Sequence, residues 1–375
     1  MTILLLSIPG LALMLLYCLK MLRYAFALSA IEEGEARIPD DCKLKISVIV
    51  PVRNEITSLP DLLADLQKQD YPLENHELIF VDDHSEDGSA EYLEERCRTV
   101  NNWGLHRLSV NSKGKKQALH EGILRAGGGW ILQTDADCRI PEGFISGHAT
   151  KACQEESLLI SGPVFSKSTA TLWSKLVALE HMSLSGTGIA SFLIGDPMLC
   201  SAANLSYSKK FYLEVAEKLL QIPSPSGDDV FLMIEAKKHK GKMSVLTSPN
   251  YVVETEPAQG PVHFFKQRIR WGAKSRYYTD PGLKSLALLV FLVNFLLSAG
   301  LVSAIFYPPV FWYFLAAFLL KSCADFFVLY FTASTFKLKQ HLWIFPLLSL
   351  FYYFYVTLAA FISLMGSYAW KGRKK

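Results

Sequence analysis

The sequence predicts an α/β domain with a mostly parallel sheet, placed between apolar segments long enough to cross a membrane. Strands and amphipathic helices alternate between residues 45 and 140, and uncharged runs of about 20 residues lie near both ends of the chain. Of the 375 residues, 50% are hydrophobic, which is high for a water-soluble protein and enough for one core together with membrane spans.

The N-terminal apolar run covers residues 3–19 and is followed by Lys20 and Arg23. Its length suits either a signal peptide or a first transmembrane helix. The small-residue cleavage pattern is weak and further spans follow, so we expect an anchor over residues 1–24.

The globular domain is expected over residues 40–280, an acceptable length for an α/β fold. It opens with KISVIVPVRNE (45–55), an apolar β-branched strand followed by a helix over 59–69. The segment ELIFVDDHSEDGS (77–89) repeats this design before a helix over 90–97. A third helix ends in the glycines before the strand WILQ (130–133), so strand and helix alternate three times and the sheet should be mostly parallel with helices on both faces.

The C-terminal region, residues 283–370, contains about three candidate spans. Leu286–Phe306 is an apolar run, Tyr307-Pro308-Pro309 interrupts it, and Val310–Phe331 and Trp343–Met365 follow. Within the second run Lys321 and Asp325 are four residues apart. Charges at that depth are costly, so we expect the two to pair and face the bundle interior rather than to contact substrate.

The distribution of basic residues places the globular domain in the cytoplasm of a multi-pass protein of the cell (inner) membrane. The residues concerned flank the spans: Lys20, Arg23, Lys274, Arg276, Lys284, Lys337 and Lys339. Four full spans would leave the basic tail KGRKK outside, so one segment could instead be re-entrant or interfacial.

Composition also excludes some functions. A net charge of +3 gives no sign of nucleic-acid binding. The seven cysteines are odd in number and form no C-x-x-C pair, which argues against a disulfide framework and a structural zinc site and favours a reducing compartment.

Reactive side chains follow each predicted strand. Ligands of parallel α/β sheets bind at the carboxyl ends of the strands. Acids in such turns often only cap the next helix, but three clusters converging on one edge beside lysines indicate a site for a divalent cation and a phosphorylated ligand. The residues are Asn54 and Glu55, Asp82 and Asp83, Asp135 and Asp137, with Lys115 and Lys116.

The order of motifs SVIVPVRNE, VDDHSEDGS, GKKQALHEG, TDADC, GDDV and QRIRW resembles the membrane-attached family 2 glycosyltransferases, which have the Rossmann-like GT-A fold. The resemblance covers about residues 45–275. It implies transfer of a sugar, with inversion, from a nucleotide diphosphate donor (a UDP- or GDP-sugar) to a lipid or glycan acceptor hydroxyl.

The resemblance also implies site residues. Asp137 matches the ligand of a Mg²⁺ or Mn²⁺ ion, and Asp135 either shares this metal or reaches the ribose. The donor positions are matched by Pro51, Arg53, Glu55, Asp83, Lys115 and Asp135.

Two further motifs concern the acceptor. Asp228 and Asp229 begin a helix, where they could simply cap it, but in the family the second acid of this pair is the catalytic base. In HFFKQRIRW, helical spacing puts Gln267, Arg270 and Trp271 on one face. The segment suits a membrane-surface helix and also resembles the family motif that contacts donor phosphates and acceptor.

Three functions remain: a transferase acting on a lipid-borne acceptor, a processive polysaccharide synthase, and a non-catalytic relative serving as an interaction subunit. The presence of the acids and of Q-x-x-R-W argues against a non-catalytic relative. Three C-terminal spans are few for a polymer channel in one chain, which makes the processive synthase the second choice.

Overall fold

The computed structural model describes residues 2–32, 39, 42–224, 227–365, 369–370 and 373–374. The chain forms two compact units. The sheet unit comprises Glu32–Lys167 and Ser191–Glu256, and the helical unit comprises Met1–Ile31, Ser168–Ala190 and Pro257–Lys375. Two segments from within the expected 40–280 domain therefore cluster with the long apolar helices, while the boundaries 1–24, 40–280 and 283–370 stay predictions.

The sheet unit is built on a seven-stranded sheet of order β3-β2-β1-β4-β8-β6-β9. All neighbouring strands are parallel except β8, which is antiparallel to β4 and β6. The mostly parallel α/β sheet predicted from the sequence is confirmed. The strands are β1 (Ile46–Val52), β2 (His76–Asp82), β3 (Trp103–Arg107), β4 (Trp130–Gln133), β6 (Leu159–Ser161), β8 (Leu205–Ser208) and β9 (Met243–Val245).

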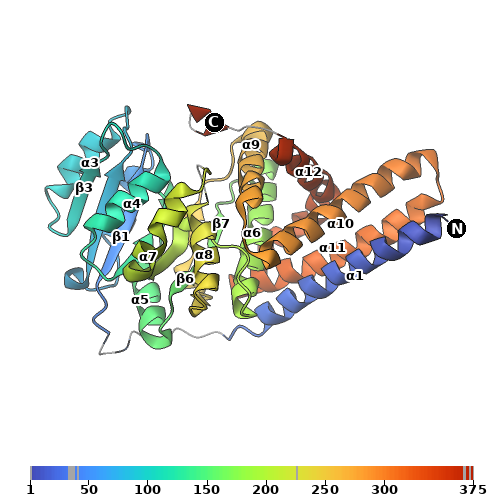
Figure 1. The fold of residues 1–375 in the computed structure, drawn as a ribbon, viewed down its shortest axis with the longest axis horizontal. Coiled ribbons are helices and arrows are strands. Elements are labelled where there is room, and N and C mark those ends of the chain that lie inside the picture. The colour runs from blue at the N-terminus through green and yellow to red at the C-terminus, as the bar shows by residue number, and fades with distance from the viewer. Residues whose placement is uncertain are drawn as a thin grey trace. The chain divides into compact units, whose positions relative to one another are not determined.

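The helices of this unit pack on the sheet through the apolar faces that their spacing predicts. In α2, Leu59, Leu62 and Leu66 are buried. Helix α4 lies beside the strands in Figure 1, and a Cβ at its Gly122 would lie 2.7 Å from Ile49 of β1, so this close approach requires glycine. The helices are α2 (Leu59–Leu66), α3 (Ser89–Cys97), α4 (Lys115–Arg125), α5 (Phe144–Glu155), α7 (Lys209–Gln221) and α8 (Asp228–Lys238).

A second, three-stranded sheet of order β5-β10-β7 follows β4 along the chain, with β5 at Cys138–Arg139, β10 at Val253–Thr255 and β7 at Val164–Ser166. Asp65 of α2 holds it in place. Its carboxylate accepts hydrogen bonds from Arg139 Nε at 2.6 Å and Nη2 at 2.9 Å, and from the backbone N–H of Ile140 at 3.2 Å. This charge-assisted pair links α2 to β5 immediately after the TDADC turn.

We predict that Asp65→Ala destabilises the protein by about 1–3 kcal/mol, because it leaves the buried Ile140 N–H and the Arg139 fork without their acceptor. Thermal unfolding of the detergent-purified protein measures this as a lower Tm. Asp61→Ala is the matched control, since Asp61 contacts the same guanidinium at 3.2 Å but its side chain is 67% exposed. That change should cost no more than about 1 kcal/mol, and equal losses in the two variants would contradict the prediction.

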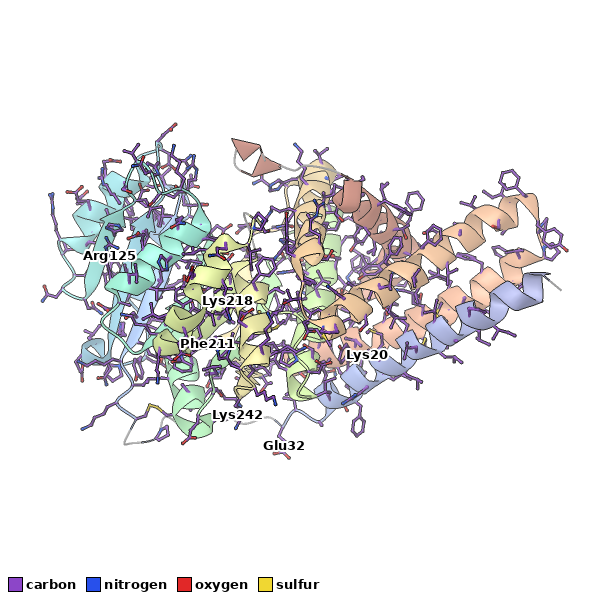
Figure 2. All side chains as sticks on the ribbon, in the orientation of Figure 1. Lys20, Glu32, Arg125, Phe211, Lys218 and Lys242 are labelled. Carbon is purple, nitrogen blue, oxygen red and sulfur yellow. A yellow bond between two sulfur atoms is a disulfide. The ribbon has the colours of Figure 1, made fainter. Side chains whose placement is uncertain are left out.

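One disulfide joins Cys42 to Cys153, with the two Cα atoms 6.1 Å apart; disulfides are drawn in yellow in Figure 2. The expectation that no disulfide forms is therefore wrong. An odd number of cysteines leaves at least one thiol over but does not prevent a single bridge between residues 111 positions apart in sequence. Free cysteines elsewhere are Cys18, Cys97, Cys138, Cys200 and Cys323.

The helical unit contains five helices that are long and apolar enough to cross a membrane by length and composition, among the described residues. Four correspond to the predicted N-terminal and C-terminal spans: α1 (Thr2–Ser29), α10 (Pro281–Phe306), α11 (Val310–Thr335), and η5 (Lys339–Ile344) continuing into α12 (Phe345–Met365). Helices α1, α10 and α11 lie side by side (Figure 1).

The fifth long helix, α6 (Leu172–Leu193), was not predicted from the sequence. Its mean hydropathy is only 1.2 and 67% of its most apolar stretch is buried, so it does not stand out as a lipid-facing span. It packs closely on α11, because a Cβ on Gly186 would lie 2.1 Å from Thr332 Oγ1. Helix α9 (Gly260–Ala273) also belongs to this unit.

The predicted pairing of Lys321 with Asp325 is confirmed. Lys321 is buried, and its Nζ lies 2.5 Å from Asp325 Oδ2. The other oxygen of Asp325 accepts a hydrogen bond from the Tyr17 hydroxyl of α1 at 2.7 Å. No sequence pattern predicted this third partner, which ties α1 to α11.

Candidate active site in the sheet unit

The carboxyl ends of β1 and β2 are joined by one arginine. Arg53, directly after β1, donates from Nη1 to the backbone oxygen of Asp83 at 2.9 Å and lies 3.5 Å from its carboxylate. The same carboxylate accepts the backbone N–H of Gly114 at 3.0 Å, at the start of α4. Asp83 is buried, so these contacts fix three segments around one acid.

Two residues after the end of β1 and of β2 the backbone adopts the left-handed conformation, with φ of 53° at Asn54 and 59° at His84. Non-glycine residues rarely adopt it, and such positions cluster at functional sites. Pro51 is the sixth residue of β1, opposite Val81 of β2. The backbone N–H of Glu55 donates to Ser89 Oγ at 2.9 Å, which ties the β1 turn to α3.

Lys115 joins the β4 end to α8. Its Nζ lies 2.5 Å from Asp135 Oδ1 and 3.7 Å from Asp228 Oδ2. Burial by itself lowers the pKa of Lys115, but the carboxylates of Asp135 and Asp228, with Asp229 further away, raise it above its ordinary value. Lys115 is therefore a cation held among three acids. These acids lie up to 94 positions apart in the sequence, from Asp135 to Asp229.

Lys116, also predicted at this rim, is used elsewhere. Its ammonium group donates to the backbone oxygens of Leu219 at 3.3 Å and Ile222 at 3.0 Å, at the end of α7. Consecutive residues at the start of a helix point in directions about 100° apart. Lys115 therefore contacts the acids, and Lys116 contacts the end of α7.

Asp229 is the second residue of α8, and Gly227, with φ of 101°, is the N-cap. Its Oδ1 accepts the N–H of Val230 at 2.7 Å, and its Oδ2 accepts the N–H of Ala202 at 3.4 Å. The carboxylate thus lies at the N-terminal, positive end of the helix dipole. Asp229 is half-buried, whereas the Oδ2 atom of Asp228 is buried without a hydrogen-bond partner.

Asp137 lies exposed in the turn between β4 and β5, two residues after Asp135. Among the described residues no group of three or more His, Cys, Asp or Glu side chains is arranged to bind a metal. Two carboxylates do not form a closed protein site, but they suit a hard cation that takes its other ligands from phosphate oxygens and water. The carboxylates of Asp135 and Asp137 therefore fit Mg²⁺ or Mn²⁺ as an open site whose other ligands are phosphate and water.

The residues of the Q-x-x-R-W motif lie on α9 of the helical unit, in the helical conformation that their spacing predicts. The Oε1 atom of Gln267 accepts a hydrogen bond from Arg268 Nη1 at 2.7 Å. The Trp271 ring lies 4.2 Å from the Arg268 guanidinium carbon. The placement of Gln267, Arg270 and Trp271 at a site shared with the acids stays a prediction.

Sequence reasoning missed several polar groups around the acids. The hydroxyl of Tyr207 on β8 donates to Gln133 Oε1 at 2.7 Å, at the last residue of β4. Gln133 Nε2 and Thr134 Oγ1 are buried without a hydrogen-bond partner. The polar pair Gln133-Thr134 directly before Asp135, at the end of an otherwise apolar strand, was the available signal.

An α/β sheet with a lysine and several carboxylates at the carboxyl ends of its strands is typical of a domain that binds a phosphorylated ligand such as a nucleotide. Comparison with known proteins assigns this part of the chain. Residues 47–213 match Glycosyl transferase family 2. Over these residues the chain thus carries a family 2 glycosyltransferase domain with the GT-A fold.

Two relatives are both named undecaprenyl-phosphate 4-deoxy-4-formamido-L-arabinose transferase. The one from Proteus mirabilis is 39% identical over 98 residues, which is 26% of this chain and 30% of that protein. The one from Aeromonas hydrophila is 34% identical over 174 residues, 43% of this chain and 52% of that protein. The chain therefore spans about half or less of the length of these relatives.

Among solved structures, a mannosyltransferase of Pyrobaculum calidifontis in complex with GDP-Man and Mn²⁺ superposes with a TM-score of 0.57. It covers 96% of this chain and 97% of its own, at 17% sequence identity. This likeness extends the shared fold beyond residues 47–213.

Proposed function

We propose that this protein is an inverting, metal-dependent glycosyltransferase that moves a sugar from a UDP- or GDP-sugar to a lipid-linked acceptor hydroxyl at the cytoplasmic face of the cell membrane. The observation that carries the proposal is the contact of Lys115 with both Asp135 and Asp228, beside Asp229. A cation held among three acids at the ligand edge of a family 2 domain suits a diphosphate leaving group.

In this proposal the donor nucleotide lies against the ends of β1 and β2. Asp83, held by Arg53 and Gly114, offers a carboxylate to base or ribose hydroxyls, and Pro51 and Glu55 line the same turn. Lys115 and Asp135 would lie beside the diphosphate group of the donor. The neighbour solved with GDP-Man supports a nucleotide sugar as the donor class.

Asp137, with Asp135, would hold the Mg²⁺ or Mn²⁺ ion, which when bound supplies a Lewis acid that neutralises the diphosphate. Protein side chains carry out the proton transfer. Asp229 accepts the proton of the acceptor hydroxyl as its oxygen bonds to the anomeric carbon. The bond from that carbon to the diphosphate breaks on the opposite face, and its electron pair leaves with the nucleotide.

The acceptor class rests on two observations. Five described helices are long and apolar enough to cross a membrane, and the two relatives carry undecaprenyl phosphate in their names. Gln267, Arg270 and Trp271 on α9 would bind phosphate and acceptor, with Arg270 supplying a bidentate contact and Trp271 an aromatic platform. The alternative, a processive polysaccharide synthase, differs in the length of its product.

Incubating the purified protein with radiolabelled nucleotide sugars, Mg²⁺ or Mn²⁺ and total membrane lipid tests the proposal. We expect one labelled product that extracts into organic solvent and carries a single sugar. A ladder of long, water-soluble products would support the processive synthase instead. No transfer from any UDP- or GDP-sugar would contradict both functions.

The side of the membrane has a separate test, because a disulfide such as Cys42–Cys153 is typical of oxidising compartments, whereas the basic residues favour the cytoplasm. We expect a membrane-impermeant maleimide to label the half-buried Cys97 in permeabilised cells but not in intact cells. Labelling in intact cells would place the domain on the outer side.

A further inference from the structure

A buried ion pair in the helical unit holds the α9 helix to α6. Arg268 Nε donates to Glu180 Oε1 at 2.9 Å, and Arg268 Nη2 donates to Glu180 Oε2. The two side chains are only 7% and 2% exposed. A two-pronged contact of this kind fixes the plane of the guanidinium group, which a lysine could not do.

A third helix completes the network. The hydroxyl of Tyr355 on α12 donates to Glu180 Oε1 at 2.7 Å. The Arg268 guanidinium also lies 4.5 Å from the centre of the Phe264 ring, and that ring packs edge-on against Tyr355 at 5.3 Å. Glu180 therefore accepts hydrogen bonds from both α9 and α12, and its negative charge is paired with Arg268 within the helical unit.

The remaining arm of Arg268 reaches the Q-x-x-R-W residues. Its Nη1 donates to Gln267 Oε1 at 2.7 Å, and its planar face lies 4.2 Å from the Trp271 ring. Because arginine has donors only, Gln267 must turn its carbonyl oxygen towards Arg268. The amide NH₂ of Gln267 then points away from Arg268, and the indole of Trp271 packs against the guanidinium group.

We propose that Glu180, Arg268 and Tyr355 are positioning residues for the transfer reaction, acting through Gln267 and Trp271. The inference rests on the proposed function, because it assumes that these two residues contact the acceptor. It gives a role to an arginine inside the motif that does not itself need to touch substrate. It also explains why a glutamate occupies a buried position of α6, where an unpaired charge would be costly.

The principal test is the double variant Glu180→Gln with Arg268→Met. Replacing both members of a buried ion pair by neutral side chains of similar size is often neutral for stability, whereas removing one leaves a buried unpaired charge. We expect the double variant to stay folded but to lose about tenfold or more in kcat/KM for the acceptor, because small misplacements of binding groups are costly. Metal-dependent binding of the nucleotide diphosphate should change less than about twofold, and a near wild-type transfer rate would overturn the inference.

Two further variants separate positioning from mere structural support. Gln267→Ala should lower transfer in the wild-type background and much less in the double variant, since residues acting through one another are not additive. Strictly multiplicative losses would contradict the inference. Tyr355→Phe, which removes one hydroxyl, should give a smaller loss of the same kind.

Lys266→Gln is the matched control, because Lys266 is an exposed cation on the same helix. It should leave transfer unchanged, and a loss equal to that of the double variant would assign the effect to the charge of α9 alone. An inactive wild-type protein would refute the proposed function, whereas an active wild type with an equally active double variant refutes only the positioning network.

Discussion

Asp229→Asn is expected to lower the rate of sugar transfer by about 10² or more while donor binding stays nearly unchanged, because the variant lacks the carboxylate that takes the acceptor proton. The structure makes this a clean substitution. Gly227, not Asp229, is the N-cap of α8, and an asparagine oxygen can still accept the Val230 N–H that Asp229 accepts at 2.7 Å. The helix should therefore form as before.

Transfer rate and calorimetric donor binding, measured on the same preparation, provide the test. A helix-capping role alone predicts little change in either quantity. Asp228→Asn is the informative neighbour, because Asp228 contacts Lys115 at 3.7 Å and should mainly alter the charge balance around that lysine. Near wild-type transfer in Asp229→Asn with a large loss in Asp228→Asn would move the base to Asp228.

Asp137→Asn should abolish transfer and weaken nucleotide diphosphate binding in the presence of Mg²⁺ or Mn²⁺. With only two carboxylates in the predicted ion site, loss of one negative charge removes a large part of what the protein contributes to holding the ion. Addition of a chelator to the wild-type protein should have the same effect, and excess Mn²⁺ should partly restore activity in the variant.

The matched control is Asp70→Asn, an exposed aspartate in the loop after α2, which should behave as wild type. Titration of nucleotide diphosphate with and without metal gives the decisive comparison. If wild-type and Asp137→Asn proteins bind and turn over equally well, and chelator changes neither, the ion does not bind here.

Much of the fold followed from local sequence patterns. The β-branched runs predicted β1, β2 and β4, the leucine spacing predicted α2, and the uncharged runs predicted α1, α10, α11 and α12. Each of these signals lies within one element, and burial of one face is enough to produce it. The acids after β1, β2 and β4 were also predictable, because parallel strands end at the same edge of a sheet.

Other features depended on partners far away in the chain. Helix α6 has a mean hydropathy of only 1.2, against 1.7 to 2.4 for the other four long helices, so it stands out less clearly in the sequence. The Cys42–Cys153 pairing could not be derived from the spacing of seven cysteines.

The alternating architecture, the apolar helices and the types of side chain at the ligand edge could be predicted from the sequence, since they depend on periodicity and composition. Which charges meet could be seen only in the folded structure. There Lys115 contacts the acids and Lys116 the end of α7, Tyr17 lies beside Asp325, and Arg268 pairs with Glu180, 88 positions away. Ion pairs and hydrogen bonds depend on distances of a few ångströms between side chains, and those distances are fixed only when the helices and strands pack together.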